Sequence, residues 1–150
     1  MSSTREAYGA ALTELADKYE FFVLMRICQK PLRPYILQKI SRPFTDMGIA
    51  ECNMMGYAAG YAASGAVVFA STFAAFAAGR AYDQIRNSIA YPNLNVKIAA
   101  THGGVLIGAD GGSHQCVGRF GPYEGSSQYD NSLSCRYHRN KKMCGRGDPI

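Results

Sequence analysis

Apolar and polar positions alternate along the chain with two periods. Residues 3 or 4 to about 19 place apolar side chains three and four positions apart with charges opposite, which is typical of an amphipathic helix. Short apolar runs predict strands at residues 21–24, 44–47, 66–70 and 95–100. Between them, residues 51–63 and 74–90 predict helices, and Tyr91-Pro92 ends the second. This alternation predicts an α/β fold, a parallel sheet with helices on both faces.

One ionisable residue stands at the head of a long uncharged segment. Residues 52–79 contain no charged side chain, and Glu51 directly precedes them. Burying a carboxylate there without a partner is costly or forces it to neutralise, so Glu51 is a candidate for chemistry. Ligands of parallel sheets bind beyond the carboxyl ends of the strands. Glu51, Phe73 and His102 each follow a predicted strand and could face one crevice.

The same uncharged segment raises the question of a membrane span. It is long enough to cross a bilayer, but Ala, Gly and Ser dominate it, and Ser64-Gly65 and Ser71-Thr72 break it into three pieces. We therefore expect no transmembrane helix. Gly56 and Gly60 match a small-residue spacing, which we interpret as close packing of a helix on the sheet.

Composition and charge narrow the function classes. A chain of 150 residues with 47% apolar content fits one globular domain. Its five irregularly spaced cysteines, and an N-terminus without the pattern of a secretory signal, favour a reducing compartment and predict a cytoplasmic protein. The net charge of +5 comes from residues 24–34 and 118–150, without a coherent basic face. We expect no nucleic-acid partner and no metal site in this chain.

Three runs together carry a resemblance to a known family. They are residues 45–54 (TDMGIAECNM), residues 79–88 (GRAYDQIRNS), and Thr101-His102 followed by residues 108–115 (GADGGSHQ). In this order they resemble the pyrimidine-binding domain of transketolase, most closely the C-terminal section of the split bacterial enzyme. 1-deoxy-xylulose-5-phosphate synthase is a cousin. The resemblance covers residues 3–117 and implies the thiamine diphosphate-binding fold.

The resemblance implies a cofactor-binding side of the site. In that family the residue at the position of Glu51 bonds N1′ of the aminopyrimidine ring of thiamine diphosphate and takes part in catalysis. Phe73 and Phe76 match aromatic residues that pack on this ring. From the residues alone, other interpretations stay open, because Glu51 could be a carboxylate stabilised by the helix dipole and the two phenylalanines could be core residues.

The resemblance also implies a substrate-binding side. His102 and His114 match histidines that contact the sugar substrate or relay its protons, and Asp110 matches an acid that reads a substrate hydroxyl. His102 favours transketolase over the synthase. A single histidine is usually structural, but two that flank a glycine-rich polar loop are typical of a proton-transfer cluster.

The implied activity is transfer of a two-carbon ketol unit between sugar phosphates with thiamine diphosphate and Mg²⁺. No Gly-Asp-Gly…Asn motif for Mg²⁺ and diphosphate occurs in the chain. These ligands are therefore expected from a partner, the transketolase N-terminal-section chain, in a homodimer or heterotetramer.

Two segments depart from the family in a way that suggests a disrupted reading frame. Codons for a family segment L-D-A-D-L-S-K-A-T-K-T, after loss of one G, encode residues 24–34 of this chain (LMRICQKPLRP). After residue 117, loss of one base likewise explains why the chain departs from a family continuation beginning V-E-D-L-A-L-M-R. We expect a pyrimidine-binding domain over residues 1–117, shifted at residues 25–34, and an irregular, frame-shifted tail over 118–150. The C-terminal domain of the family is expected to be missing.

Two functions of different classes remain open. The first is a transketolase-like enzyme component that is inactive as an isolated chain. The second is a non-catalytic relic of a disrupted gene, or a pairing module. The alternative enzyme is 1-deoxy-xylulose-5-phosphate synthase.

Overall fold

Parallel strands run through the centre of the part of the chain that the structure describes. The computed structural model describes residues 4–25, 44–105 and 107–116. The sheet has the strand order β2-β1-β3-β4, and every pair is parallel. The strands span β1 (Phe22–Met25), β2 (Phe44–Asp46), β3 (Val68–Phe73) and β4 (Val96–Thr101). In this register Phe73 pairs with Thr101, so β3 and β4 end side by side.

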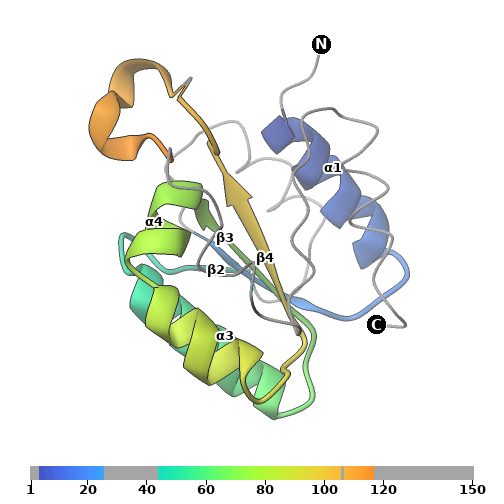
Figure 1. The fold of residues 1–150 in the computed structure, drawn as a ribbon. Helices are drawn as coiled ribbons and strands as arrows, with labels where there is room; N and C mark the ends of the chain where they lie inside the picture. The colour runs from blue at the N-terminus through green and yellow to red at the C-terminus, as the bar shows by residue number, and fades with distance from the viewer. Residues whose placement is uncertain (1–3, 26–43, 106, 117–150) are drawn as a thin grey trace.

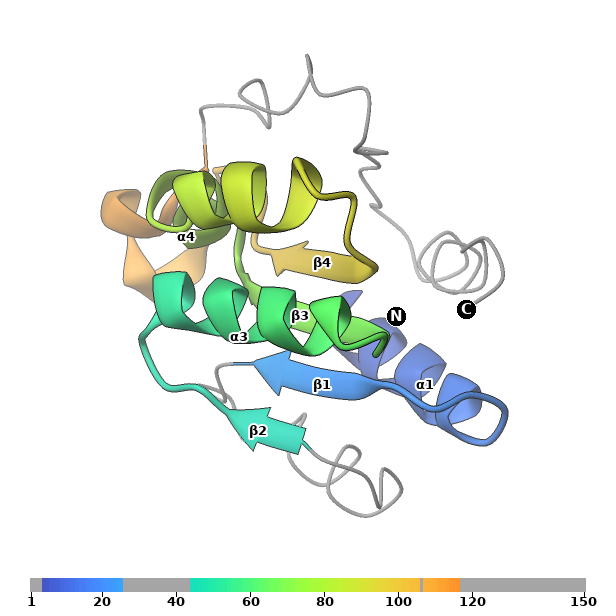
Figure 2. The ribbon, with the colours of Figure 1, turned by 90° about the horizontal axis from the view of Figure 1, so that it is seen from below.

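Helices cover both faces of the sheet, as the sequence predicts (Figures 1 and 2). One face packs on α1 (Thr4–Ala16). The other packs on α3 (Glu51–Ala63), α4 (Ala74–Gly79) and the π-helix η1 (Gln84–Ala90). The α/β architecture with a parallel sheet is thereby confirmed.

Alternating side chains of the strands build two apolar clusters. Val23 and its neighbours on that face pack against Leu12 of α1, while Leu24 and Val68 pack against Met55 of α3. Successive side chains of a strand point to opposite faces, so a strand buried on both faces needs a continuous apolar run. This explains why the central strand β1 is an unbroken apolar segment, whereas β2 and β4, which are less buried, include Asp46 and Lys97.

Two predicted boundaries need correction. Ser71 and Thr72 do not break the chain, because both are buried inside β3, which continues to Phe73. The helix predicted over residues 74–90 is interrupted after Gly79, a residue type that is a poor helix former. At this interruption the N–H groups of Arg80 and Ala81 both donate to the Phe76 carbonyl, at 3.0 and 3.2 Å.

The packing predicted for Gly56 and Gly60 is wrong. Both glycines lie on the exposed side of α3, and no atom lies within 4 Å of a Cβ placed on either one. Met54 and Met55, not the glycines, face the sheet. Within the described residues, no helix combines the length and the apolar character that crossing a membrane requires.

The predicted frame-shifted segments fall almost entirely outside the described residues. These are residues 26–34 and the tail 118–150. The frame shifts, the irregular tail and the division of the chain at residue 117 therefore stay predictions.

Candidate functional site

The carboxyl ends of the strands carry the predicted site residues. The loop after β2 turns at Gly48, whose φ of +64° lies in the left-handed region, and its N–H is held by Asp46 Oδ1 at 3.0 Å. This turn brings Glu51 to the first position of α3. Phe73 ends β3, and His102 follows β4 directly, so the three residues come from neighbouring connections at one edge of the sheet.

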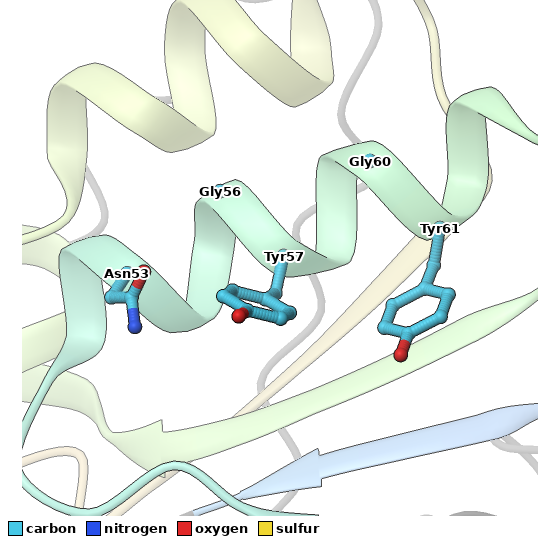
Figure 3. A pocket seen from close by; sticks show the side chains of 5 residues that line it. All are labelled: Asn53, Gly56, Tyr57, Gly60 and Tyr61. Carbon is cyan, nitrogen blue, oxygen red and sulfur yellow. The ribbon is translucent and has the colours of Figure 1, made fainter.

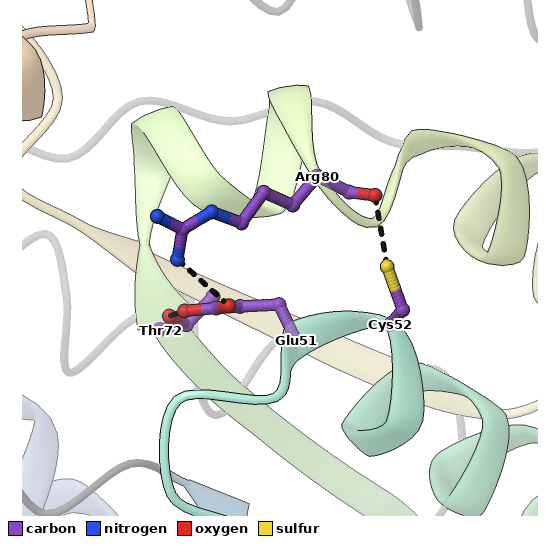
Figure 4. Close-up of polar contacts among 4 residues, drawn as sticks. All are labelled: Glu51, Cys52, Thr72 and Arg80. Atoms are coloured by element: carbon purple, nitrogen blue, oxygen red, sulfur yellow. Dashed lines mark hydrogen bonds and ion pairs between the residues drawn. The ribbon is translucent and has the colours of Figure 1, made fainter.

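Glu51 is buried, and both of its carboxylate oxygens have partners (Figure 4). Only 3% of the residue is exposed to solvent. Thr72 Oγ1 donates to Oε1 at 3.2 Å, and Arg80 Nη1 donates to Oε2 at 3.2 Å. A buried carboxylate requires such hydrogen-bonded and ionic partners, so this polar centre satisfies the demand that the sequence raises.

Sequence reasoning named neither partner. The signal for Arg80 was present, because it is the first charged residue after the uncharged segment. Arg80 still has helical φ and ψ, and its N–H donates to the Phe76 carbonyl one turn earlier, at 3.0 Å. The helical period places Arg80 one turn after Phe76, but it does not say that the side chain meets Glu51. Thr72 was missed because residues 71–72 were interpreted as a break and not as buried strand.

Four of the predicted residues form an aromatic cluster. The Phe73 and Phe76 rings stack with centroids 5.9 Å apart and an interplanar angle of 6°. The His102 ring lies 4.0 Å from that of Phe73, and the His114 ring lies 4.9 Å from that of Phe76 and 5.8 Å from that of Phe73. Residues 73, 76, 102 and 114, far apart in sequence, are thus brought together.

Arg80 joins the aromatic cluster to Glu51. Its guanidinium carbon lies 4.0 Å from the centroid of the Phe76 ring while Nη1 contacts the carboxylate. A second link runs through Thr101, whose hydroxyl lies 2.8 Å from His102 Nδ1 and donates to the Thr72 carbonyl at 3.5 Å. The carboxylate and the rings therefore belong to one connected site.

The histidine side of the site is built from turns. His102 has a φ of +58°, a left-handed conformation that costs a non-glycine residue about 1 kcal/mol. His114 ends the short 3₁₀ turn η3 (Gly112–His114), with its Nδ1 2.9 Å from Ser113 Oγ. Asp110 lies exposed in η2 (Gly108–Asp110), outside the aromatic cluster. The structure thus brings both histidines to the site and leaves Asp110 at its surface.

A separate surface pocket lies on the outer side of α3. Its volume is about 570 Å³, and it is lined by Asn53, Gly56, Tyr57, Gly60 and Tyr61 (Figure 3). None of these residues belongs to the aromatic cluster. Among the described residues, no three side chains of His, Cys, Asp and Glu gather closely enough to hold a metal ion.

Comparison with known families shows to which family the chain belongs. The family model described as transketolase, pyrimidine binding domain, matches residues 28–120, more than half of the chain. The chain belongs to the transketolase pyrimidine-binding domain family. The resemblance inferred from the three sequence runs is thereby confirmed.

Individual relatives point the same way. A putative transketolase C-terminal section from Methanocaldococcus jannaschii is 47% identical over 113 residues, covering 74% of this chain and 36% of that protein. A solved structure described as a split gene transketolase, inactive beta4 tetramer, is 50% identical, with a TM-score of 0.62 over 75% of this chain and 36% of that chain. A 1-deoxy-D-xylulose-5-phosphate synthase from Lysinibacillus sphaericus is 44% identical over 82 residues, or 55% of this chain and 13% of the synthase. The chain thus spans about a third of the length of the split-transketolase relatives.

Proposed function

We propose that this chain is the pyrimidine-binding component of a transketolase that works with a separate chain. The observation that carries the proposal is that a buried carboxylate, with one partner on each oxygen, lies next to stacked aromatic rings at the carboxyl edge of the sheet. In the proposed complex, thiamine diphosphate lies between the two chains. The two-carbon ketol group passes between sugar phosphates.

The residues present fit the aminopyrimidine ring of this cofactor. A planar, hydrogen-bonding heterocycle needs a polar partner at its edge and apolar partners on its face. Glu51 offers the edge contact, and Phe73 and Phe76 offer the apolar surface. When bound, thiamine diphosphate supplies the electron sink for cleavage of a carbon–carbon bond.

Glu51 has the role of holding a proton at N1′ of the ring. A carboxylate has about four acceptor sites, and the two contacts with Thr72 and Arg80 leave room for one more hydrogen bond. Its burial excludes water, so the proton stays between the carboxylate and the ring and is not exchanged freely with solvent. General acid–base groups of this kind contribute roughly 10²–10⁴-fold to a rate.

The histidine side has the role of binding the sugar and moving its protons. His102 and His114 place two imidazoles against the phenylalanine rings, where they would meet a substrate bound beside the cofactor. Imidazole exchanges protons readily near neutral pH. Asp110, which is exposed in the same loop, has the role of binding a hydroxyl group of the substrate.

The diphosphate and Mg²⁺ are assigned to the partner, a transketolase N-terminal-section chain. Two relatives support this division, because one is described as a transketolase C-terminal section and the other as a split gene transketolase. The assembly we propose is a homodimer of this chain or a heterotetramer with the partner. The cytoplasmic location stays a prediction from the cysteines and the N-terminus.

Two other functions each have one observation in their favour. The synthase relative supports an activity like that of 1-deoxy-xylulose-5-phosphate synthase. His102 speaks against this activity, because by resemblance it favours transketolase. The name of the solved relative includes an inactive tetramer, and together with the two proposed frame shifts this supports a non-catalytic relic or pairing module. Sequencing the gene separates the relic from the enzyme component, since an intact frame at both places removes the relic.

The proposal is tested by reconstitution. We expect the isolated chain neither to bind thiamine diphosphate tightly nor to turn over, because it lacks the diphosphate and Mg²⁺ ligands. Addition of the N-terminal-section chain, with the reading frame repaired, should give ketol transfer. Calorimetry that shows micromolar binding to the isolated chain, a free energy of about −8 kcal/mol, contradicts the division of the site between two chains.

A further inference from the structure

Arg80 contacts the site at three points. Nη1 lies 3.2 Å from Glu51 Oε2, and the guanidinium carbon lies 4.0 Å from the centroid of the Phe76 ring. Its carbonyl oxygen accepts a hydrogen bond from Cys52 Sγ at 3.0 Å, so backbone and side chain both meet the first turn of α3 (Figure 4). The Arg80 side chain is 50% exposed, so water could solvate its charge without these contacts. The contacts therefore call for another explanation.

Two of these contacts are with Glu51 and Phe76. In the proposed function, Glu51 meets the edge of the aminopyrimidine ring and Phe76 meets its face. We propose that Arg80 is a positioning residue, which holds the Glu51 carboxylate and the Phe76 ring in a fixed relation so that a planar aminopyrimidine meets both at once. The inference rests on the proposed function of Glu51 and Phe76. It adds a residue that the resemblance did not assign.

The chemistry of arginine suits this task better than that of lysine. A guanidinium is planar, can stack on an aromatic ring and can donate in its own plane to a carboxylate at the same time. An ammonium is a point charge that can meet the carboxylate but cannot stack as a plane. Thr72 holds the other carboxylate oxygen from β3, so the plane of the carboxylate is set from two elements.

The test uses the full chain mixed with a transketolase N-terminal-section chain, and its readout is hydrogen–deuterium exchange at C2 of thiamine diphosphate. Arg80→Met keeps roughly the length of the side chain but removes the positive charge and the planar set of N–H donors. C2 exchange should therefore slow roughly tenfold to a hundredfold, as for a displaced catalytic group. Arg80→Lys should recover part of the loss because the charge returns. Arg86→Met, at an exposed arginine of η1, is the matched control and should exchange like the parent.

Action through Glu51 has a signature that a merely structural role lacks. In a Glu51→Gln background, Arg80→Met should slow the exchange by a clearly smaller factor than in the parent, because the carboxylate it holds is gone and only the Phe76 ring is left to be displaced. An equal slowing in both backgrounds overturns the proposal. The proposal is also overturned if Arg80→Met exchanges as fast as its parent while Glu51→Gln exchanges slowly. That result does not contradict the proposed function of Glu51.

A second readout uses the isolated chain. It applies if Glu51→Gln does not slow C2 exchange, or if the mixture of the two chains shows no C2 exchange. A double-mutant cycle of Glu51→Gln and Arg80→Met in urea unfolding measures the coupling of the two side chains directly. A coupling of about fivefold or more in the unfolding equilibrium constant supports Arg80 as the residue that holds Glu51. A coupling below about twofold overturns it, whatever the fate of the proposed function.

Discussion

The two sides of the site differ in how the fold holds them. Glu51 is buried at the head of a regular helix and is bound by residues of β3 and of the interruption after α4. His102 and His114 lie at the two ends of a loop of 3₁₀ turns with several residues of positive φ. The Phe73 and Phe76 rings lie between these two sides, because they contact the histidines and Phe76 also contacts Arg80, the partner of Glu51.

The difference corresponds to the two tasks in the proposed function. A group that shares a proton with a resident cofactor needs a fixed, water-excluded position, which regular elements and paired hydrogen bonds supply. A substrate must enter and leave, and turns at the surface supply polar groups without closing the site. Variants on the two sides should therefore have separable effects.

The largest effect is expected at the buried side. Glu51→Gln keeps the shape of the side chain but cannot accept the proton at N1′, so exchange at C2 in the reconstituted complex should slow by a factor on the order of 10²–10⁴. Hydrogen–deuterium exchange followed by NMR measures it, with circular dichroism as the control for folding. A variant that exchanges as fast as the parent shows that the role assigned to Glu51 is wrong.

The opposite pattern is expected at the turn side. His114→Ala should slow ketol transfer roughly 10²-fold, since a general acid–base group is lost from the sugar steps. C2 exchange should stay nearly intact because Glu51 and its partners are untouched. Coupled-enzyme assays and exchange are measured on the same preparation. If both rates fall together, the two sides of the site are not separable.

Sequence alone was sufficient for the sheet and for the placement of Glu51, Phe73 and His102 at the carboxyl ends of its strands. The apolar run at residues 66–70 is typical of a strand buried on both faces. Phe73 ends that strand, His102 directly follows β4, and Glu51 begins the helix after β2. The partners of Glu51 were not predicted, because the helical period of residues 74–90 does not say which neighbouring element the Arg80 side chain faces. The exposure of Gly56 was missed for a related reason, since small residues are equally compatible with either face of a helix.

A smaller effect, on stability, is expected from the hydrogen bond inside the polar centre. Thr72→Val keeps the shape of a buried side chain and removes the donor to Glu51 Oε1, so unfolding free energy should fall by about 1–3 kcal/mol. Thr13→Val is the matched control, because its part-buried hydroxyl donates to the Gly9 carbonyl within α1, away from the polar centre. Urea denaturation of the isolated chain compares them. An equal loss in both variants contradicts a special role for the Thr72 contact.

The smallest effect is expected from two glycines, one on each side. Gly48 (φ +64°) sets the turn that leads into α3, and Gly111 has φ 70° and ψ −165°, a region that is essentially restricted to glycine. A Cβ at either position meets no atom within 4 Å, so substitution by alanine introduces backbone strain alone. The strain at Gly48 acts on the connection that positions Glu51, and Gly48→Ala should lower the unfolding free energy by about 1 kcal/mol.

Gly111→Ala has the less favourable conformation and yet should lower the global stability less. The turns around Gly111 lie at the surface with Asp110, Gly112 and Ser113 exposed, so the loop can open locally and release the strain without unfolding the sheet. Urea denaturation gives the global value for both variants. Native-state hydrogen exchange of the loop amides should show faster opening only for Gly111→Ala. If Gly111→Ala destabilises the whole domain more than Gly48→Ala, the loop is coupled to the core as tightly as Glu51 is.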